Sequence, residues 1–197
     1  MDEYAVNSIK NHMKGFGRLI MVHFLGVALG WAAFPLILIL LARYTTVDVP
    51  MAVFSVFATI IMGLMLLAQG NEYGITDRKP YKWARYKAKG FVLGASVGLV
   101  VFILELIIIA VADSNFVVSH PQFNISNVNS YIRMILYVPF FWFFKLTGEA
   151  GAIMPRVTML SALIVIPIES IFTGIGYILG SKGIVLDFKI NLFRRKK

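Results

Sequence analysis

Four long stretches of this chain are apolar and almost free of charge, and they limit its fold more than any other feature. Residues 19–42 and 49–68 contain no Lys, Arg, Asp or Glu, and residues 90–112 and 157–180 contain one glutamate each. A helix needs about 20 mostly apolar residues to cross the ~30 Å hydrocarbon layer of a bilayer. The sequence therefore predicts four transmembrane helices.

The composition agrees with an all-α polytopic membrane protein. Hydrophobic residues make up 58% of the 197 positions and charged residues 15%, whereas soluble domains have roughly 45–50% and about 25%. The first apolar stretch is too long for the core of a cleaved signal peptide, so we expect it to remain as a span. Residues 1–197 are predicted to form a single helical membrane domain. Cysteine is absent, which excludes disulfides and thiolate metal sites.

The distribution of basic residues predicts the orientation of the chain. With four spans, the N-terminal segment, the loop of residues 69–89 and the C-terminal tail lie on one side and hold 15 of the 19 Lys and Arg residues. Basic loops remain in the cytoplasm, so we expect both termini to be cytoplasmic, in a cell (plasma) membrane. A fifth crossing by residues 131–145 would divide the basic residues 11 to 8 and is therefore disfavoured.

Residues 131–145 form a shorter apolar segment dense in Tyr, Trp and Phe. Its uncharged part, residues 134–144, has 11 positions, about half the length of a span. Aromatic side chains are typical of the membrane–water interface, so we expect an interfacial helix that lies flat on the outer leaflet. The alternative is a re-entrant segment broken at Pro139, which would need protein or water around its exposed backbone groups.

Glycines spaced four residues apart mark helix faces that can approach a neighbour closely. The faces predicted in this way contain Gly26 and Gly30 in the first span, and Gly90, Gly94 and Gly98 in the third. One interpretation is that both faces pack against helices of the same chain. The other is that the face in the third span binds a second copy of the chain or another membrane protein.

Two glutamates inside predicted spans are candidates for lining a polar path. Glu169 lies 11 residues before Gly180, about 16 Å from the cytoplasmic face, and Glu105 is about 6 Å deeper. An ionisable residue at such a depth faces the bundle interior or a wet cavity and is a functional candidate. The alternative is that both are protonated structural residues. Pro167 predicts a kink beside Glu169, and His23 is expected at the interface because it is near the start of the first span.

The loop of residues 69–89 carries a cluster of basic residues: Arg78, Lys79, Lys82, Arg85, Lys87 and Lys89. Because the loop joins two spans, we expect anionic lipid headgroups rather than nucleic acid as its partner, at about 1 kcal/mol for each Lys or Arg. The alternative is that the cluster reflects only the excess of Lys and Arg that cytoplasmic loops of membrane proteins carry, without lipid recognition.

No metal site, cofactor motif or catalytic motif is apparent, so we expect a non-enzymatic protein without cofactors. The leading hypothesis is a membrane component of a transport or translocation system in which Glu169, and with it Glu105, lines a polar path. The alternative is a non-catalytic accessory or scaffold subunit that binds another membrane protein through its glycine faces. A lipid-modifying enzyme is a third class, for which Asp77 and Glu72 are the only acids in the basic loop.

Overall fold

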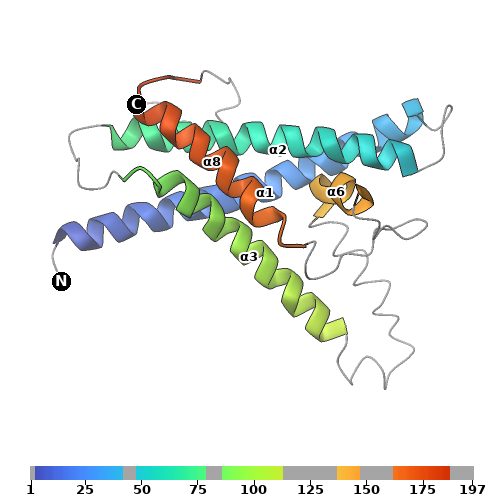
Figure 1. Cartoon of the computed structure of the whole chain (residues 1–197), viewed down its shortest axis with the longest axis horizontal. Helices are drawn as coiled ribbons and strands as arrows, with labels where there is room; N and C mark the ends of the chain where they lie inside the picture. Colours follow the sequence, from blue (N-terminus) through green and yellow to red (C-terminus); the bar gives the residue numbers. More distant parts are fainter. Residues whose placement is uncertain (1–2, 42–47, 79–85, 113–136, 147–161, 187–197) are drawn as a thin grey trace. The chain divides into compact units, whose positions relative to one another are not determined.

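The computed structural model describes residues 3–41, 48–78, 86–112, 137–146 and 162–186. All regular secondary structure in these residues is helical (Figure 1). They fall into two compact units, and each unit is described by itself. The first unit takes its described residues from 1–23, 63–98 and 166–197, and the second takes them from 24–62 and 99–165.

Three helices are long and apolar enough to cross a membrane, with candidate spans at Lys10–Ala33, Ala52–Asp77 and Lys89–Ile108. They are α1 (Glu3–Leu41), α2 (Asp48–Asp77) and α3 (Lys89–Ala112). The prediction of an all-helical chain with helices of membrane-spanning length is therefore confirmed for these three.

The first two helices are longer than the apolar stretches that predicted them. α1 begins 16 residues before residue 19, and α2 continues nine residues beyond residue 68. Residues 69–77 are thus helical, whereas we expected a loop. An apolar stretch marks only the part of a helix that is free of charge. The polar residues at 69–77 continue the helix because other parts of the protein cover them.

The fourth predicted span differs most from expectation. α8 comprises Val165–Ser181 and is about 25 Å long at ~1.5 Å per residue. Pro167 lies in its first turn, where the missing N–H has no helical partner to lose. The expected kink beside Glu169 is therefore replaced by the start of the helix. Residues 157–161 lie outside the described residues.

α8 ends in a turn that depends on glycine. The Ile184 N–H donates to the Leu179 carbonyl at 3.0 Å, and the Gly183 N–H donates to the Gly180 carbonyl at 2.9 Å, which is a Schellman motif. Gly183 has a φ of 88°, a left-handed conformation that favours glycine. The chain leaves α8 at a fixed angle as a result.

In the first unit, α8 packs closely against α2 through glycines on both helices (Figure 1). A β-carbon on Gly70 or Gly74 of α2 would collide with backbone atoms of α8, and one on Gly176 or Gly180 of α8 would collide with backbone atoms of α2. Contact between backbones is the GxxxG mode of helix association in membranes. The two helices therefore interlock, and the glycine pair of α2 lies in the stretch that we expected to be a loop.

α3 contacts another side of α8 in the same unit. A β-carbon on Gly90 or Gly94 would collide with backbone atoms of α8, and the Ser170 hydroxyl of α8 donates to the Phe91 carbonyl at 3.0 Å. Gly98 is buried as well. Of the two interpretations of this glycine face, contact within the chain is the one observed at Gly90 and Gly94.

In the second unit, α1 packs against α2 at the glycines of the first span. A β-carbon on Gly26 would press on Met62, and one on Gly30 would press on Ala58. Small residues again allow the two helices to approach closely. This glycine face is therefore also used within the chain.

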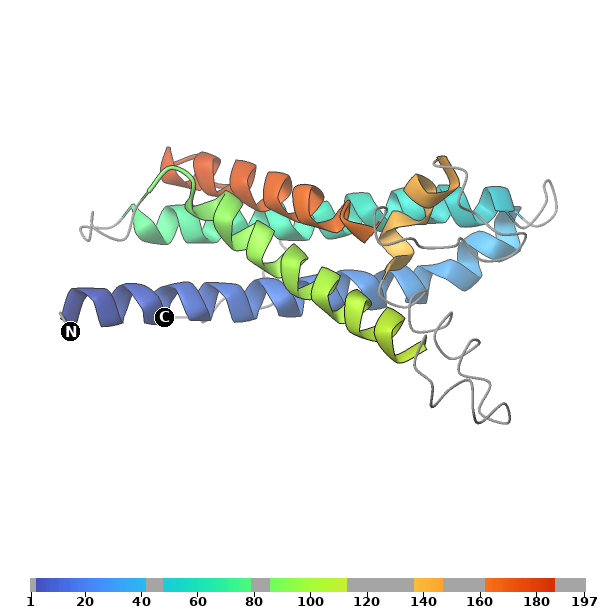
Figure 2. The same ribbon diagram turned by 60° about the horizontal axis from the view of Figure 1, so that its bottom comes forward.

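The aromatic segment of the second unit is a short 3-10 helix followed by a short α-helix. The 3-10 helix η2 (Val138–Phe140) has Pro139 in its first turn and leads directly into α6 (Phe141–Leu146) (Figure 2). Tyr137, Phe140 and Phe144 are fully buried. Buried rings would not be expected of a helix that lies flat with its aromatic face towards lipid. Pro139 lies at the start of η2, and the residues before Tyr137 are outside the described residues, so the choice between an interfacial helix and a re-entrant segment stays a prediction.

Hydrogen bonds join α2 to backbone groups of this segment. The Trp142 backbone N–H donates to the Ser55 hydroxyl at 2.7 Å. The Trp142 indole N–H donates to the Thr59 hydroxyl at 2.9 Å, and that hydroxyl donates to the Pro139 carbonyl. Two hydroxyl groups of α2 therefore hold this segment to that helix.

Candidate functional site

Two titratable side chains meet in the interior of the first unit. Nδ1 of His23 on α1 is in ion-pair contact with Oε1 of Glu169 on α8, and both side chains are 0% exposed. A charged or polar group in such a place is costly unless a partner compensates it. A proton between these two atoms can be carried by either the imidazole or the carboxylate.

His23 reaches the interior because α1 starts long before the apolar stretch does. It lies 20 residues after the first residue of α1, on the same face as Leu19, which is also fully buried. We expected His23 at the membrane interface because we counted from residue 19. The structure places its side chain in the interior of the unit, and its depth in a membrane stays a prediction.

Contacts on neighbouring turns hold Glu169 in place. Its carbonyl faces Gly94 of α3, and Phe172, three residues further along α8, covers Gly63 of α2. These contacts fix α8 against two helices close to the carboxyl group, while the side chain itself reaches α1. The pair therefore depends on four helices, although only two of them supply titratable atoms.

A second buried polar cluster lies where α2 stops and α3 starts. Lys89 Nζ donates to Asp77 Oδ2 at 2.6 Å, and the Tyr177 hydroxyl donates to the same oxygen at 2.9 Å. The side chains of Lys89 and Asp77 are only 7% and 10% exposed. Burial, and after it the Asp77 carboxylate, raises the pKa of Tyr86. One carboxylate therefore ties α2, α3 and α8 together.

Glu72 takes part in a more exposed contact. Arg18 Nη1 lies 3.7 Å from its Oε1, with side chains 28% and 34% exposed, and Gln69 Nε2 donates to Oε2 at 3.2 Å. An ion pair this accessible to solvent contributes up to about 1 kcal/mol to the free energy of unfolding. We assign Glu72 a structural role between α1 and α2.

Asn71 binds the segment that follows α8. Its side-chain N–H donates to the Ile184 carbonyl at 2.8 Å, and its Oδ1 accepts the Leu186 N–H at 3.1 Å. Asn71 is 2% exposed, so both bonds are shielded from water. Sequence reasoning missed this residue, whose one signal is its place between Gly70 and Gly74 of a glycine pair.

The other predicted site residues are placed as follows. Glu105 is fully buried and belongs to the second unit, whereas Glu169 belongs to the first. A network shared by the two acids therefore stays a prediction. Among the described residues, no group of three or more His, Cys, Asp or Glu side chains could hold a metal ion.

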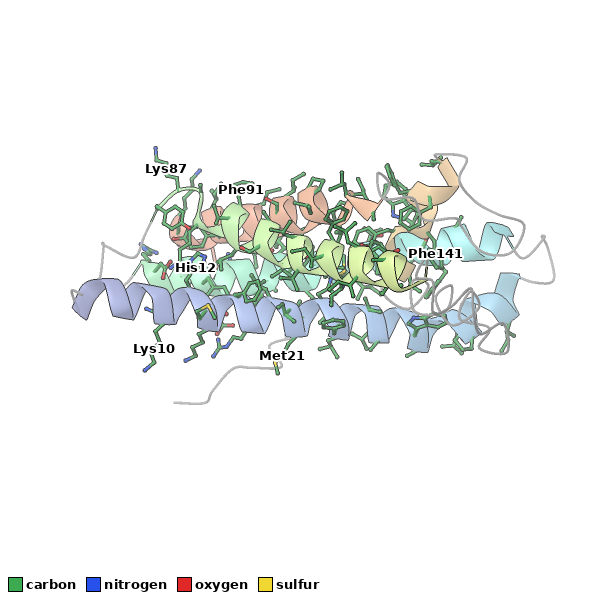
Figure 3. All side chains as sticks on the ribbon, turned by 90° about the horizontal axis from the view of Figure 1, so that it is seen from below. Lys10, His12, Met21, Lys87, Phe91 and Phe141 are labelled. Atoms are coloured by element: carbon green, nitrogen blue, oxygen red, sulfur yellow. The ribbon has the colours of Figure 1, made fainter. Side chains whose placement is uncertain are left out.

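The predicted headgroup-binding residues divide into three kinds. Arg78 and Lys87 are exposed, and Lys87 points away from the helices (Figure 3). Lys89 instead binds Asp77 inside the protein and is not available to a headgroup. The others lie outside the described residues and are Lys79, Lys82 and Arg85.

Sequence reasoning singled out His23 but placed it at the interface and did not pair it with Glu169. The available signal was that His23 is the only titratable side chain in residues 19–42. Its importance depended on how far the helix extends before the apolar stretch, which hydropathy does not show. No family model, no curated protein and no solved structure matches the chain. The functional argument therefore rests on the geometry of the His23–Glu169 pair.

Proposed function

We propose that this chain is an integral membrane component of a transport or translocation system in which the His23–Glu169 pair takes up and releases a proton. The observation that carries the proposal is the contact between an imidazole and a carboxyl group that are both 0% exposed. Ionisable residues inside a membrane domain commonly mark ion pathways and proton relays. If the contact between α1 and α8 were only structural, apolar side chains would make it without the free-energy penalty of removing charged groups from water.

The depth of the pair supports this proposal. Glu169 lies 12 residues, or about 18 Å, before Ser181, and His23 lies eight residues, or about 12 Å, beyond Gly15. Both lengths are measured from the same end of the unit, because Gly15 of α1 contacts Tyr73 of α2 and Gly180 of α8 contacts Asn71, two residues away on α2. The pair therefore falls well inside a ~30 Å hydrocarbon layer.

In the proposed arrangement this end of the first unit faces the cytoplasm of the cell that holds the protein in its plasma membrane. The exposed residues Lys10, Lys14, Arg78, Lys87 and Lys182 all belong to the first unit. Lys10 and Lys87 point outward (Figure 3). Anionic lipid headgroups are the partner that matches these charges.

The scaffold alternative loses the surfaces on which it was based. Gly26, Gly30, Gly90 and Gly94 all contact helices of the same chain. A partner protein would have to bind a different surface, and lipid suffices to cover the exposed apolar side chains. The transport hypothesis is therefore the better supported of the two.

Proton flux into vesicles tests the proposal. The purified chain is reconstituted into vesicles that enclose a pH-sensitive dye, and a pH gradient is imposed in the presence of valinomycin and potassium. We expect faster proton entry than in empty vesicles, and we expect Glu169→Gln to return the rate to that of empty vesicles. Glutamine keeps the size of the side chain and some hydrogen-bonding capacity but cannot carry the proton.

Glu72→Gln is the matched control, because it makes the same change at a glutamate that lies nearer the surface. It should retain the parental flux. If Glu169→Gln conducts protons as fast as the parent, the pair does not carry the proton, and the scaffold alternative takes its place.

A further inference from the structure

A row of buried polar side chains follows one face of α8 from the His23–Glu169 pair towards the end of the helix. Glu169, Thr173 and Tyr177 are spaced four residues apart, so their side chains follow one another along that face. They are 0%, 0% and 1% exposed. The Tyr177 hydroxyl donates to Asp77 Oδ2 at 2.9 Å. The row therefore leads from the carboxyl group of Glu169 to that of Asp77.

Thr173 is the informative member of the row. Its hydroxyl is buried and has no hydrogen-bond partner within the part of the chain that the structure describes. A buried hydroxyl without a partner costs about 1–3 kcal/mol, and an ordered water commonly satisfies such a group. Thr173 is four residues, or about 6 Å along the helix, from each neighbour in the row. A single water can bridge two polar groups over that spacing.

We propose that Thr173, Tyr177 and Asp77 form the proton route between the His23–Glu169 pair and the end of the unit where α2 stops. This inference rests on the proposed function, since it serves the same pair. A proton that leaves Glu169 passes through water to the Thr173 oxygen while that hydroxyl releases its own proton. Tyr177 repeats this step, and the proton it releases arrives at Asp77 Oδ2. Each hydroxyl gains one proton and loses one, so only the pair and Asp77 change charge.

Asp77 is suited to be the outer end of the route. Its side chain is 10% exposed, whereas the three members of the row are within 1% of full burial. Three other titratable groups surround it: Lys89 donates to the same oxygen, and His12 and Tyr86 lie within electrostatic range.

The experiment measures proton exchange at the pair itself. The full chain is labelled with 15N-histidine and placed in lipid nanodiscs, and NMR follows the rate at which the ring N–H of His23 exchanges with water. A His23→Asn variant assigns the signal among the three histidines. We expect Tyr177→Phe and Thr173→Val each to slow this exchange by about tenfold or more, which is the effect of losing one hydrogen-bonded step.

The choice of variants allows the result to contradict the proposed route. Thr173→Val keeps the shape of the side chain and removes no existing hydrogen bond to the described residues, so the variant should fold. Tyr73→Phe is the control, because the Tyr73 hydroxyl bonds backbone carbonyls of α1 and lies off the row. Parental exchange in both row variants, or equal slowing in Tyr73→Phe, overturns the route.

The failure of this inference is distinguishable from that of the proposed function. If Glu169→Gln abolishes flux while the row variants exchange His23 protons at the parental rate, the pair functions through another route, and this inference is wrong. If the parent shows no flux but the row variants slow exchange, the route is supported and the transport proposal is wrong.

Discussion

Gly176 on α8 lies against the Leu67 carbonyl on α2, so closely that a β-carbon on the glycine would collide with that oxygen. Gly176→Ala should therefore push the two helices apart and lower the stability of the first unit. Backbone atoms cannot move aside as the end of a flexible side chain can. We expect a loss of about 1–3 kcal/mol, typical of overpacked sites, measured as thermal unfolding in detergent.

Gly17→Ala is the control for this prediction. A β-carbon on Gly17 of α1 would have nothing within 4 Å, and alanine favours a helix over glycine by up to about 1 kcal/mol. The control should therefore be neutral or stabilising. Equal stability of the Gly176 variant and the parent would show that α2 and α8 do not make this close contact.

The bond between Lys89 and Asp77 supports a second prediction. Asp77→Asn leaves a buried ammonium group without its carboxylate, and breaking a buried pair in this way costs about 3–5 kcal/mol. Lys89→Met in addition removes the unpaired charge and should restore part of the lost stability. The interaction free energy from the double-mutant cycle should be well above zero. Additive effects would contradict a direct pairing of the two residues.

Much of the helical framework could be predicted from the sequence. α3 (Lys89–Ala112) was placed to within one residue, because its apolar stretch is closed by Lys89 and Asp113. Glu169 was identified as a candidate for the same reason, since a lone acid in such a stretch is conspicuous. These features depend only on local hydropathy.

The contacts of polar residues could not be predicted in this way. Residues 69–77 looked like a loop because they include Asn71, Glu72 and Asp77, yet all three bind partners outside α2. His23 contacts Glu169 because α1 begins well before its apolar stretch and because glycines allow α8 to pack close to its neighbouring helices. Pairing of this kind depends on helix rotation and depth, to which average hydropathy is insensitive.

Cysteine labelling tests the proposed topology in a chain that has no cysteine of its own. Cysteines at the exposed positions Lys87 and Lys182 should react with a membrane-impermeant maleimide only from the cytoplasmic side. A cysteine at Ser114, beyond the apolar stretch of the third span, should react only from the opposite side. Reaction of the Lys87 and Lys182 sites from opposite sides would rule out the arrangement with four spans.

The last prediction concerns the Thr59 hydroxyl, which joins the aromatic segment of the second unit to α2. Thr59→Val removes the acceptor of the Trp142 indole N–H and the donor to the Pro139 carbonyl. Buried groups left unpaired cost about 1–3 kcal/mol, so the segment should separate from α2 at lower denaturant. Trp142 fluorescence reports this step once the two other tryptophans, Trp31 and Trp83, are replaced by phenylalanine.

Thr76→Val is the matched control for Thr59→Val, because the Thr76 hydroxyl is exposed and donates only to its own helix. Its transition should coincide with that of the parent, and a Thr59 variant that did the same would show that the segment is held by apolar packing alone.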